Sequence, residues 1–426
     1  MDKFLLAGSG EKAQYLVHEF NDNTIRFLLY YPGHPAPELL RDAVRTLVER
    51  VDILHASFFS DSLGAHWHIN NDLEDSHFFQ YVETAGDPGP TAQSLALLPI
   101  APDSKAQLLC SLVQGPDCCA VVVTISHLCV DGGDGKYLLE KLAQAYRLLQ
   151  DTGTAAGLEV KNGSRAAEQV YRHFSPKELF SLLKNPFSSA SSSFPFPVSR
   201  PGLRSLTHVL IPASVMTQAR QNAKAAGATA NDLLLASCYH AYASLPGADL
   251  SHPIGITSMM DLRRHCPGGE SEGLCNLSGS LPTCLELTRE IPFSDILSQV
   301  AAQTRTAKED PLAGLYGMPL LHGAARTLPM GLLLQVAGKL YGSMSLGLTN
   351  LGNIPCAPLA LGDLVPTGGL FGGPLKKKPG MQISAASFDG ACSLVVVGQY
   401  TREDAALLQS MLDAMAGALA VYASPL

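Results

Sequence analysis

Hydrophobic positions along the chain repeat with two different periods, one typical of strands and one typical of helices. Between Pro37 and Arg50 they fall three and four residues apart, which predicts an amphipathic helix. The pattern predicts further helices over 135–149, from Thr229 onward and over 403–421, and strands over 24–31, 107–113, 119–126, 205–211, 253–257, 382–388 and 392–400. Because 119–126 is apolar almost throughout, we expect this strand in the middle of a sheet. Alternating strands and helices indicate an α/β protein.

The pattern is interrupted near the middle of the chain. Residues 185–201 are rich in Ser, Pro and Phe and show neither a helical nor a strand period, which is typical of a linker. A chain of 426 residues is also longer than one ordinary hydrophobic core accommodates. We therefore expect two related α/β domains, at 1–185 and 205–426, joined by a linker at 186–204.

Composition narrows the class of protein. Apolar residues make up 46% of the chain and charged residues 16%, which is typical of a globular protein. The net charge of -8 argues against nucleic acid as a partner, because phosphate binding needs a basic surface. The start of the chain lacks the pattern of a secretory signal, and no apolar run is long enough to span a bilayer, so we expect a cytoplasmic protein without a transmembrane segment. The ten cysteines form no CxxC pair, so we expect reduced thiols and no zinc site.

The segment from Ser126 to Gly133 is the strongest candidate for chemistry. His127 follows an apolar strand directly, and Asp131 and two glycines precede a predicted helix. A histidine with a pKa near ~6.5 can take and return a proton at neutral pH. Each residue also has a structural interpretation, because a lone histidine after a strand is more often structural than catalytic. Asp131 suits a helix N-cap, and the glycines suit a turn.

The motif His-x-x-x-Asp-Gly at 127–132 resembles the superfamily of thioester-dependent acyltransferases, which includes nonribosomal peptide condensation domains and alcohol acetyltransferases. Other segments resemble parts of the same proteins in the expected order. The segment 21–58 is similar to their opening strand and helix, and 228–235 to a helix start in their second domain. Residues 256–263 resemble a strand that delivers an arginine, 273–276 a Gly-x-x-Asn turn, and 349–352 a Ser-Asn-x-Gly segment. The order of these matches adds weight to the single strong motif.

The resemblance implies two chloramphenicol-acetyltransferase-like domains that form a V with an interfacial tunnel. By analogy, His127 is the general base that takes a proton from an alcohol or amine acceptor, which then attacks a thioester. The donor is coenzyme A or the phosphopantetheine arm of a carrier protein, so acyl-coenzyme A or a phosphopantetheinyl thioester is a substrate and no cofactor is bound permanently.

The resemblance also assigns roles to other residues. Asp131 is expected to be structural and to pair with an arginine, for which Arg263 is the first candidate and Arg264 the second. Gly132 is expected to permit the turn beside His127. Asn350 either helps to bind the acyl oxygen as charge develops or caps a turn.

One departure from the pattern leaves the acceptor class open. Condensation domains usually carry two histidines in tandem, whereas Ser126 stands at the first position here. We therefore expect a stand-alone acyltransferase first and a carrier-dependent condensation enzyme, which forms an amide or ester, second. A non-catalytic relative that binds thioesters or a partner protein is the third possibility, and the intact motif argues against it.

Two weaker signals complete the picture. Lys376, Lys377 and Lys378 lie between glycine- and proline-rich segments, and they suit either a solvated loop or a contact with the phosphates of the thioester donor. His66 and His68 flank the only tryptophan on one face of a predicted strand, as a metal pair would need. Since the sequence offers no third ligand, we expect no metal site.

Overall fold

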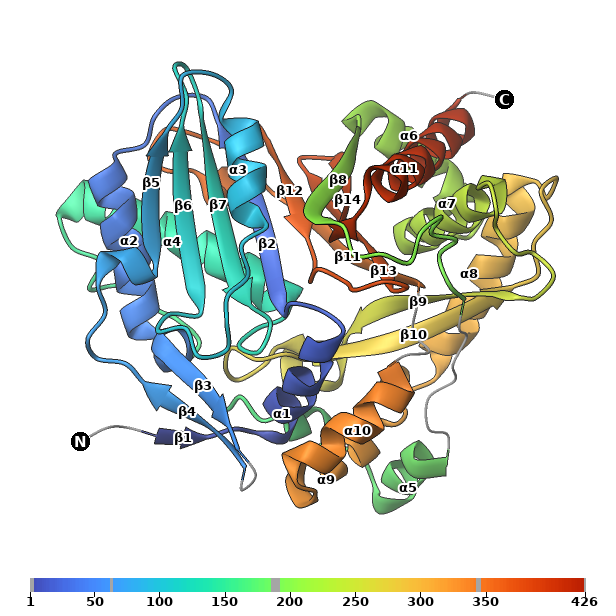
Figure 1. Cartoon of the computed structure of the whole chain (residues 1–426), viewed down its shortest axis with the longest axis horizontal. Helices are drawn as coiled ribbons and strands as arrows, with labels where there is room; N and C mark the ends of the chain where they lie inside the picture. Colours follow the sequence, from blue (N-terminus) through green and yellow to red (C-terminus); the bar gives the residue numbers. More distant parts are fainter. Residues whose placement is uncertain (1–3, 62–63, 185–191, 342–345, 425–426) are drawn as a thin grey trace.

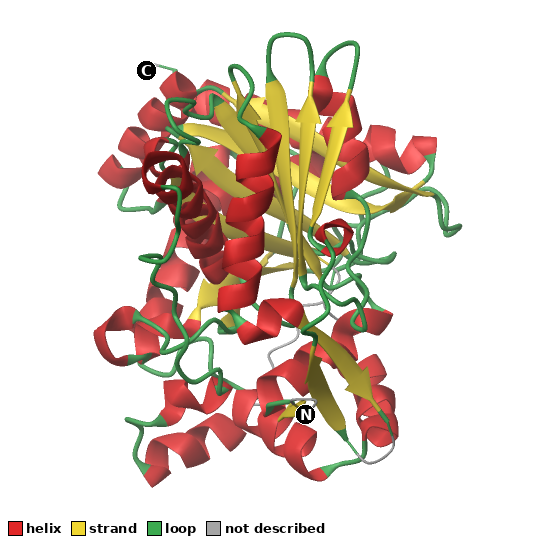
Figure 2. Cartoon of the chain, turned by 90° about the vertical axis from the view of Figure 1, so that its left-hand side faces the viewer, coloured by secondary structure: helices red, strands yellow, loops and turns green. Residues whose placement is uncertain are grey.

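The strands of this protein lie at the centre of the molecule with helices around them (Figures 1 and 2). The computed structural model describes residues 4–61, 64–184, 192–341 and 346–424. In these ranges the strands form sheets of five, six and three strands. The mixed α/β class predicted from the sequence is confirmed.

The five-stranded sheet belongs mainly to the first half of the chain. Its order is β12 (Gly368–Gly372), β2 (Thr24–Tyr31), β7 (Cys119–Ser126), β6 (Leu108–Gln114) and β5 (Phe79–Glu83). Helix α3 (Pro88–Ala96) packs on one face, while α2 (Pro37–Arg50) and α4 (Gly132–Thr152) pack together beyond the other. As predicted, β7 is central, and its residues are buried throughout because both faces of the sheet are covered.

The six-stranded sheet belongs to the second half. Its order is β10 (Ser278–Leu285), β9 (Ile254–Asp261), β11 (Leu346–Ile354), β13 (Met381–Phe388), β14 (Ala391–Tyr400) and β8 (Leu203–Ile211). The helices that share its core are α6 (Ala213–Ala225), α7 (Ala230–Ser244), α8 (Phe293–Glu309) and α11 (Arg402–Ala423). The predicted start of α7 is confirmed, because the side chain of Thr229 accepts a hydrogen bond from the Asp232 amide.

One strand of the second half lies in the sheet of the first. Strand β12 pairs antiparallel with β2, with Leu370 opposite Leu28, and so completes the edge of the five-stranded sheet. Figure 1 shows it in orange beside the blue strand β2. The domain limits at 185 and 205 stay a prediction, but no single cut in the sequence separates the two sheets. Residues 185–191 of the predicted linker lie outside the described part.

Smaller elements fill the lower part of the molecule in Figure 1. The three-stranded sheet has the order β1 (Phe4–Leu6), β4 (Ala65–Ile69) and β3 (Ala56–Ser60). Helix α1 (Ser9–Leu16) contacts α9 (Met318–Thr327) and α10 (Met330–Tyr341), and α9 also contacts α5 (Pro176–Lys184). These contacts connect the start of the chain to its second half.

Helix α11 is the one described helix that is long and apolar enough to cross a membrane. Its 22 residues place Leu408, Met411 and Met415 in the core of the second half, and the helix packs on α7, α6 and β8. A core helix of a globular protein meets the same test of length and hydropathy, so the finding is weak evidence for a membrane span.

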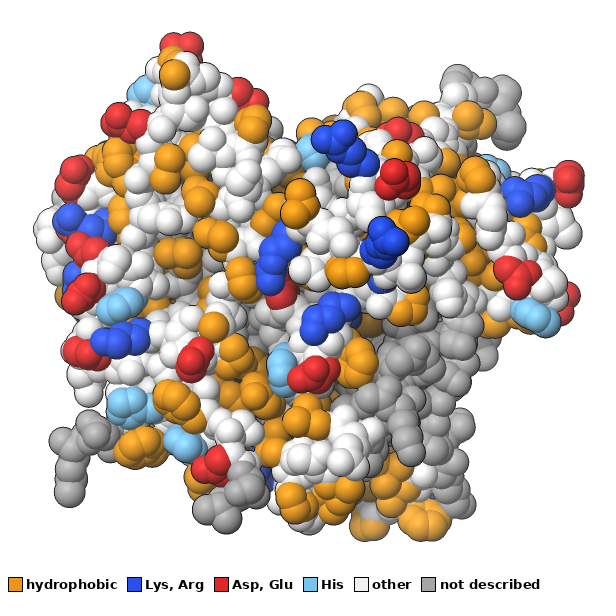
Figure 3. Space-filling model, in the orientation of Figure 1, with side chains coloured by type: hydrophobic (Ala, Val, Ile, Leu, Met, Phe, Trp, Pro, Cys, Tyr) orange, Lys and Arg blue, Asp and Glu red, His pale blue; other side chains and the backbone are white. Residues whose placement is uncertain are grey.

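On the face shown in Figure 3, basic and acidic side chains are interspersed.

Local sequence signals predicted several element boundaries correctly. Strands β2 and β7 and helix α2 span the predicted residues. Helix α4 begins three residues earlier than expected from the hydrophobic period, because Asp131 caps it by accepting a hydrogen bond from the Asp134 amide at 3.0 Å. The strands predicted over 382–388 and 392–400 form β13 and β14, and the hairpin turn between them has Asp389 and Gly390 at φ 44° and 92°.

Candidate functional site

A cavity of about 460 Å³ lies where elements of the two halves meet. His127 lines it together with residues of α1, β9, β10, β11 and α9, and with the segment that follows β12. The cavity therefore takes its walls from segments that are far apart in the sequence. The predicted V shape and a tunnel open on two faces stay predictions.

His127 is held by its own turn. It lies directly after β7, and its backbone amide donates a hydrogen bond to the carbonyl oxygen of Asn23 at 2.7 Å. Its Nδ1 lies 2.7 Å from the carbonyl oxygen of Val130. Because a carbonyl oxygen can only accept, the neutral imidazole carries its proton on Nδ1, and Nε2 keeps a lone pair. The turn thus fixes both the orientation and the tautomer of the ring.

The environment of His127 favours the neutral ring. Burial lowers its pKa below the ordinary value of 6.5, and the Val130 carbonyl and Asp131 only partly oppose this effect. The positive charge of Lys376 lowers the pKa further. A histidine that is neutral at pH 7 and has a free Nε2 can act as a general base.

Three amide side chains form a row of hydrogen bonds that reaches the histidine at Asn276. The Asn276 Nδ2 lies 3.2 Å from Nδ1 of His127 and donates to Oε1 of Gln14 at 3.1 Å. Gln14 in turn donates to Oδ1 of Asn23 at 2.8 Å. Sequence reasoning placed Asn276 only in a turn and missed Gln14 and Asn23, since amide side chains carry no recognisable spacing. This row of hydrogen bonds depends on contacts between residues up to 262 positions apart.

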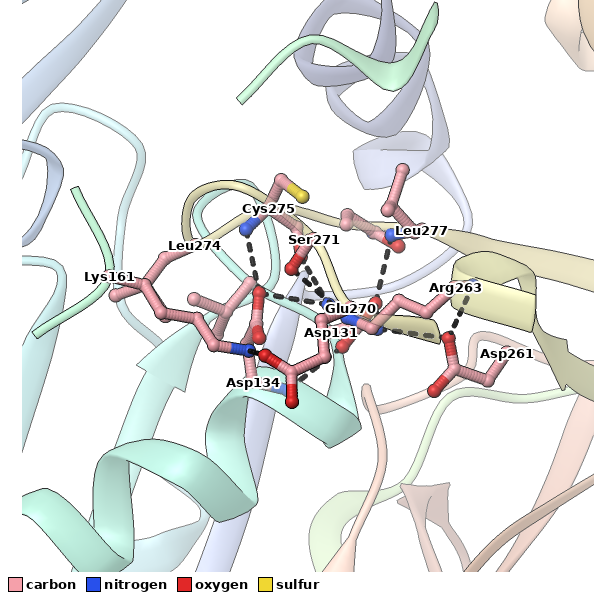
Figure 4. A network of polar contacts seen from close by, with 12 residues as sticks. Asp131, Asp134, Lys161, Asp261, Arg263, Glu270, Ser271, Leu274, Cys275 and Leu277 are labelled. Carbon is pink, nitrogen blue, oxygen red and sulfur yellow. Dashed lines mark hydrogen bonds and ion pairs between the residues drawn. The ribbon is translucent and has the colours of Figure 1, made fainter. Parts of the chain in front are cut away.

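Arg263 holds the helix that follows the histidine (Figure 4). Its Nη1 donates to Oδ2 of Asp131 at 2.8 Å, and its Nη2 lies 2.8 Å from Oδ2 of Asp134. All three side chains are at least nine-tenths buried. Arg263, the first candidate partner of Asp131, therefore contacts it directly, whereas the exposed Arg264 donates to the carbonyl of Lys308.

The same carboxylates also bind the loop that precedes β10. The amide of Leu277 donates to Asp131 at 2.8 Å, and the amide of Cys275 donates to Asp134 at 2.8 Å. Burial raises the pKa of Asp134 to about 6, and the charge of Asp131 adds to the rise while Arg263 opposes it. Burial alone would lower the pKa of Arg263, but Asp131 and Asp134 together raise it above its usual value. Arg263 thus remains charged and joins the start of α4 to the second half.

Gly132 has a packing reason for its missing side chain. A Cβ atom built on it would lie well inside contact distance of Cδ2 of Leu351, on β11. Its φ angle is not in the left-handed region, so the turn itself does not require glycine. Glycine is therefore favoured at position 132, but the reason is the close approach of β11 rather than the turn.

We expect Gly132→Ala to lower the free energy of unfolding by about 1–3 kcal/mol, because Leu351 must move in a packed interior. Chemical denaturation of the purified variant measures this change. The double variant Gly132→Ala with Leu351→Ala removes the clash, so it should lose less than the two single changes added together. If the losses of the two single variants simply add up in the double variant, the contact with Leu351 is not the cause of the loss.

Asn350 serves as a turn cap. Its Oδ1 accepts a hydrogen bond from the amide of Gly352 at 2.9 Å, where the pairing of β11 with β13 shifts register and Gly352 has φ 70°. Thr349 lines the cavity, and Asn350 is absent from its lining. The geometry therefore supports the structural role of Asn350, and contact with an acyl oxygen stays a prediction.

The three consecutive lysines have different surroundings and do not form one basic cluster. Lys378 forms an ion pair with the buried Asp404 and donates to the carbonyls of Val198 and Arg200, so it is a structural residue. All three residues line the cavity, but Lys377 is exposed and Lys376 is half-buried. A joint phosphate contact by all three side chains lacks geometric support, because Lys378 already has an acidic partner.

The paired histidines of β4 contact aromatic rings. His68 stacks on Phe4 with ring centroids 5.0 Å apart, and His66 lies 5.8 Å from Phe59. Within the described residues, no group of three or more His, Cys, Asp or Glu side chains is arranged to hold a metal ion.

Comparison with known proteins adds information on the fold. No protein-family model matches the chain, and no curated protein matches its sequence. Among solved structures, the first condensation domain of the CDA synthetase matches with a TM-score of 0.69 and 16% identity, over 100% of this chain and 97% of that one.

Two further structures have a similar fold. The epimerization domain from the third module of tyrocidine synthetase B matches with a TM-score of 0.66 and 15% identity, over 99% of this chain and 97% of that one. The starter condensation domain of rhizomide synthetase, solved with C8-CoA and Leu-SNAC, matches with a TM-score of 0.64 and 15% identity, over 99% and 96%. The chain therefore has the fold of condensation domains, as its sequence motifs indicated.

Proposed function

We propose that this protein is an acyltransferase that moves an acyl group from a thioester to an alcohol or amine, with His127 as the general base. The observation that carries the proposal is the state of His127. It lines the cavity, its Nδ1 proton is directed to the Val130 carbonyl, and its pKa is lowered by burial. The fold alone does not assign an activity, since condensation and epimerization domains share it.

The proposed reaction uses the free nitrogen of the histidine twice. Nε2 of His127 accepts the proton of the acceptor O–H or N–H while the acceptor oxygen or nitrogen bonds to the thioester carbonyl carbon. The carbon–sulfur bond then breaks, and the departing sulfur takes the proton from the imidazolium. The Val130 carbonyl accepts from Nδ1–H throughout and keeps the ring in place. Asp131 acts through the turn: it contacts Arg263 and α4, whereas Nδ1 of the imidazole donates to the Val130 carbonyl.

The donor is coenzyme A or a carrier-bound phosphopantetheine, and the rhizomide domain with its C8-CoA ligand supports a donor of this class. Ser126 in place of a first histidine leaves His127 itself unaffected and favours a stand-alone acyltransferase over peptide-type condensation. The second candidate is a carrier-dependent condensation enzyme, which the likeness to the CDA synthetase domain supports. A non-catalytic thioester-binding protein is the least favoured, because His127 and the Asp131–Arg263 pair are both intact.

Release of free thiol tests the proposal. The purified chain is incubated with acetyl- and octanoyl-coenzyme A and a panel of alcohols and amines, and then with the same acyl groups on a carrier protein. Thiol release that needs an acceptor supports acyl transfer. Turnover with the carrier-bound acyl group but not with the coenzyme A thioester would favour the condensation enzyme. No turnover with either donor would favour a binding protein.

The pH profile gives an independent check on the base. A general base must be neutral, so kcat/KM is lost as the pH falls through the pKa of free-enzyme His127. Because that pKa is lowered, we expect the acid limb of the profile below pH 6.5. Steady-state kinetics from about pH 5 to pH 8 measure it. An acid limb above the ordinary histidine pKa would contradict the assignment.

A further inference from the structure

Lys376 brings a positive charge into the same cavity as His127. Its backbone lies at the junction of the two halves: it bridges to Asn21 near the start of the chain and to Gly398 in β14. Its amide also donates to the carbonyl of Val397 at 3.3 Å. The backbone is thus held from both sides, and the side chain is half-buried.

The acidic groups around Lys376 form ion pairs with other residues. Asp22, whose charge acts on Lys376, pairs with Arg26 and, at 3.3 Å, with Arg204. Asp22 also accepts the Leu375 amide at 2.9 Å. Glu19 is the acidic side chain in the cavity lining; it is exposed and pairs with His18 at 2.9 Å.

Among the ion pairs of the described residues, none involves Lys376, whereas the neighbouring Lys378 has Asp404. Burial lowers the pKa of Lys376 to about 8, and Asp22 only partly opposes this effect. An ammonium that is partly desolvated and lacks a carboxylate partner loses favourable hydration, and an anion bound next to it would offset that loss. The cavity is therefore arranged to accept a negatively charged group close to the histidine.

We propose that Lys376 binds a carboxylate of the acyl acceptor, so that the acceptor is an amino acid or hydroxy acid with a free carboxylate. This inference rests on the proposed function, because it takes His127 as the base for the same molecule. An acceptor held by Lys376 through its carboxylate can present its amine or hydroxyl to Nε2 of His127. A carrier-bound acceptor lacks that carboxylate, since it is converted to a thioester.

A carboxylate fits this position better than the phosphate of the donor. In coenzyme A and in carrier arms, the whole length of pantetheine separates the phosphate from the thiol. The thioester carbonyl must lie at the acceptor beside His127, so the phosphate lies far from that point. Lys376 and His127 line the same cavity. The backbone of Lys376 bridges to Asn21, two residues before Asn23, whose carbonyl accepts the His127 amide. This geometry puts Lys376 on the side of the cavity that holds the histidine.

The affinity of the protein for two small molecules, measured by calorimetry at neutral pH, tests the site without turnover. The probes are 4-phenylbutyrate and its amide, which differ only in the charged group. We expect the wild type to bind the carboxylate at least about tenfold more tightly than the amide, as for a charge-assisted hydrogen bond. Lys376→Met should abolish this preference, and Lys376→Arg should restore most of it. Lys377 lines the same cavity but is exposed to solvent, so Lys377→Met is the matched control and should keep the preference.

Equal binding of the two probes by the wild type, or loss of the preference in Lys377→Met, would overturn the proposal. Coenzyme A is the third probe. If Lys376→Met weakens coenzyme A binding but leaves the carboxylate preference, Lys376 meets a phosphate and the proposal is wrong. Thiol release with amino acids and their amides then separates the two inferences. Absence of turnover with an intact carboxylate preference would contradict the proposed function and leave the anion site standing.

Discussion

We expect His127→Ala to lower kcat for acyl transfer by about 10²–10⁴-fold, which is the usual contribution of a positioned general base. The variant should fold, because the ring is half-buried and its Nδ1 makes one hydrogen bond to a backbone carbonyl. A net loss of about 0.5–1.5 kcal/mol in the free energy of unfolding is the ordinary value for one such bond. Thiol-release kinetics and a denaturation curve on the same preparation measure both quantities.

A second histidine in the cavity lining provides the control. His322 lies on α9, is buried, and contacts the hydroxyl of Tyr171 at 3.3 Å. Burial lowers its pKa to about 4, so it is neutral throughout the range of the assay. His322→Gln should therefore keep kcat within a few fold of the wild type under conditions where it is folded. An equal loss in both variants would mean that the cavity is sensitive to any change, and would remove the special role of His127.

The largest effect on stability is expected at Arg263. Arg263→Met leaves Asp131 and Asp134 buried together without their common cation, and we expect a loss of about 3–5 kcal/mol in the free energy of unfolding. The loss should be accompanied by lower activity, because the start of α4 and the turn of His127 lose their connection to the second half. Urea denaturation followed by circular dichroism measures the change.

Arg264→Met is the matched control, since this neighbouring side chain is exposed and donates only to the Lys308 carbonyl at 3.3 Å among its described contacts. Its effect on the free energy of unfolding should stay within about 0.5 kcal/mol.

Asp131→Asn keeps the shape of the side chain but weakens the pair with Arg263, so we expect it to lower both stability and activity. Full stability with lost turnover in Asp131→Asn would instead favour a direct role of the carboxylate in the reaction.

Much of the fold could be read from the sequence. The limits of β2, α2 and β7 follow from short-range periodicity, and the caps at Asp131 and Thr229 follow from side chains three residues from their partners. The Asp389–Gly390 turn follows from its position between two strand patterns. The pairing of β12 with β2 could not be read, because a five-residue strand rich in glycine carries little pattern of its own.

The candidate site was only partly predictable. The resemblance pointed to His127 and to a pair between Asp131 and Arg263, and these two side chains are in contact. It did not indicate that Asp134 shares the same guanidinium or that Asn276 lies beside the imidazole. The three lysines looked alike in sequence, and Asp404 distinguishes Lys378 from the other two.

By itself, the sequence determined the position of several strands and helices and which histidine follows the central strand, because these features depend on residues within a few positions of each other. Tertiary structure decided which side chains contact the histidine and its neighbours. Val130 fixes the ring locally, but Asn276 and Arg263 reach the same turn from 149 and 132 residues away. Lys376 enters the cavity because its backbone is held at the junction of the halves. Such contacts follow from the packing of two sheets, and no local spacing encodes them.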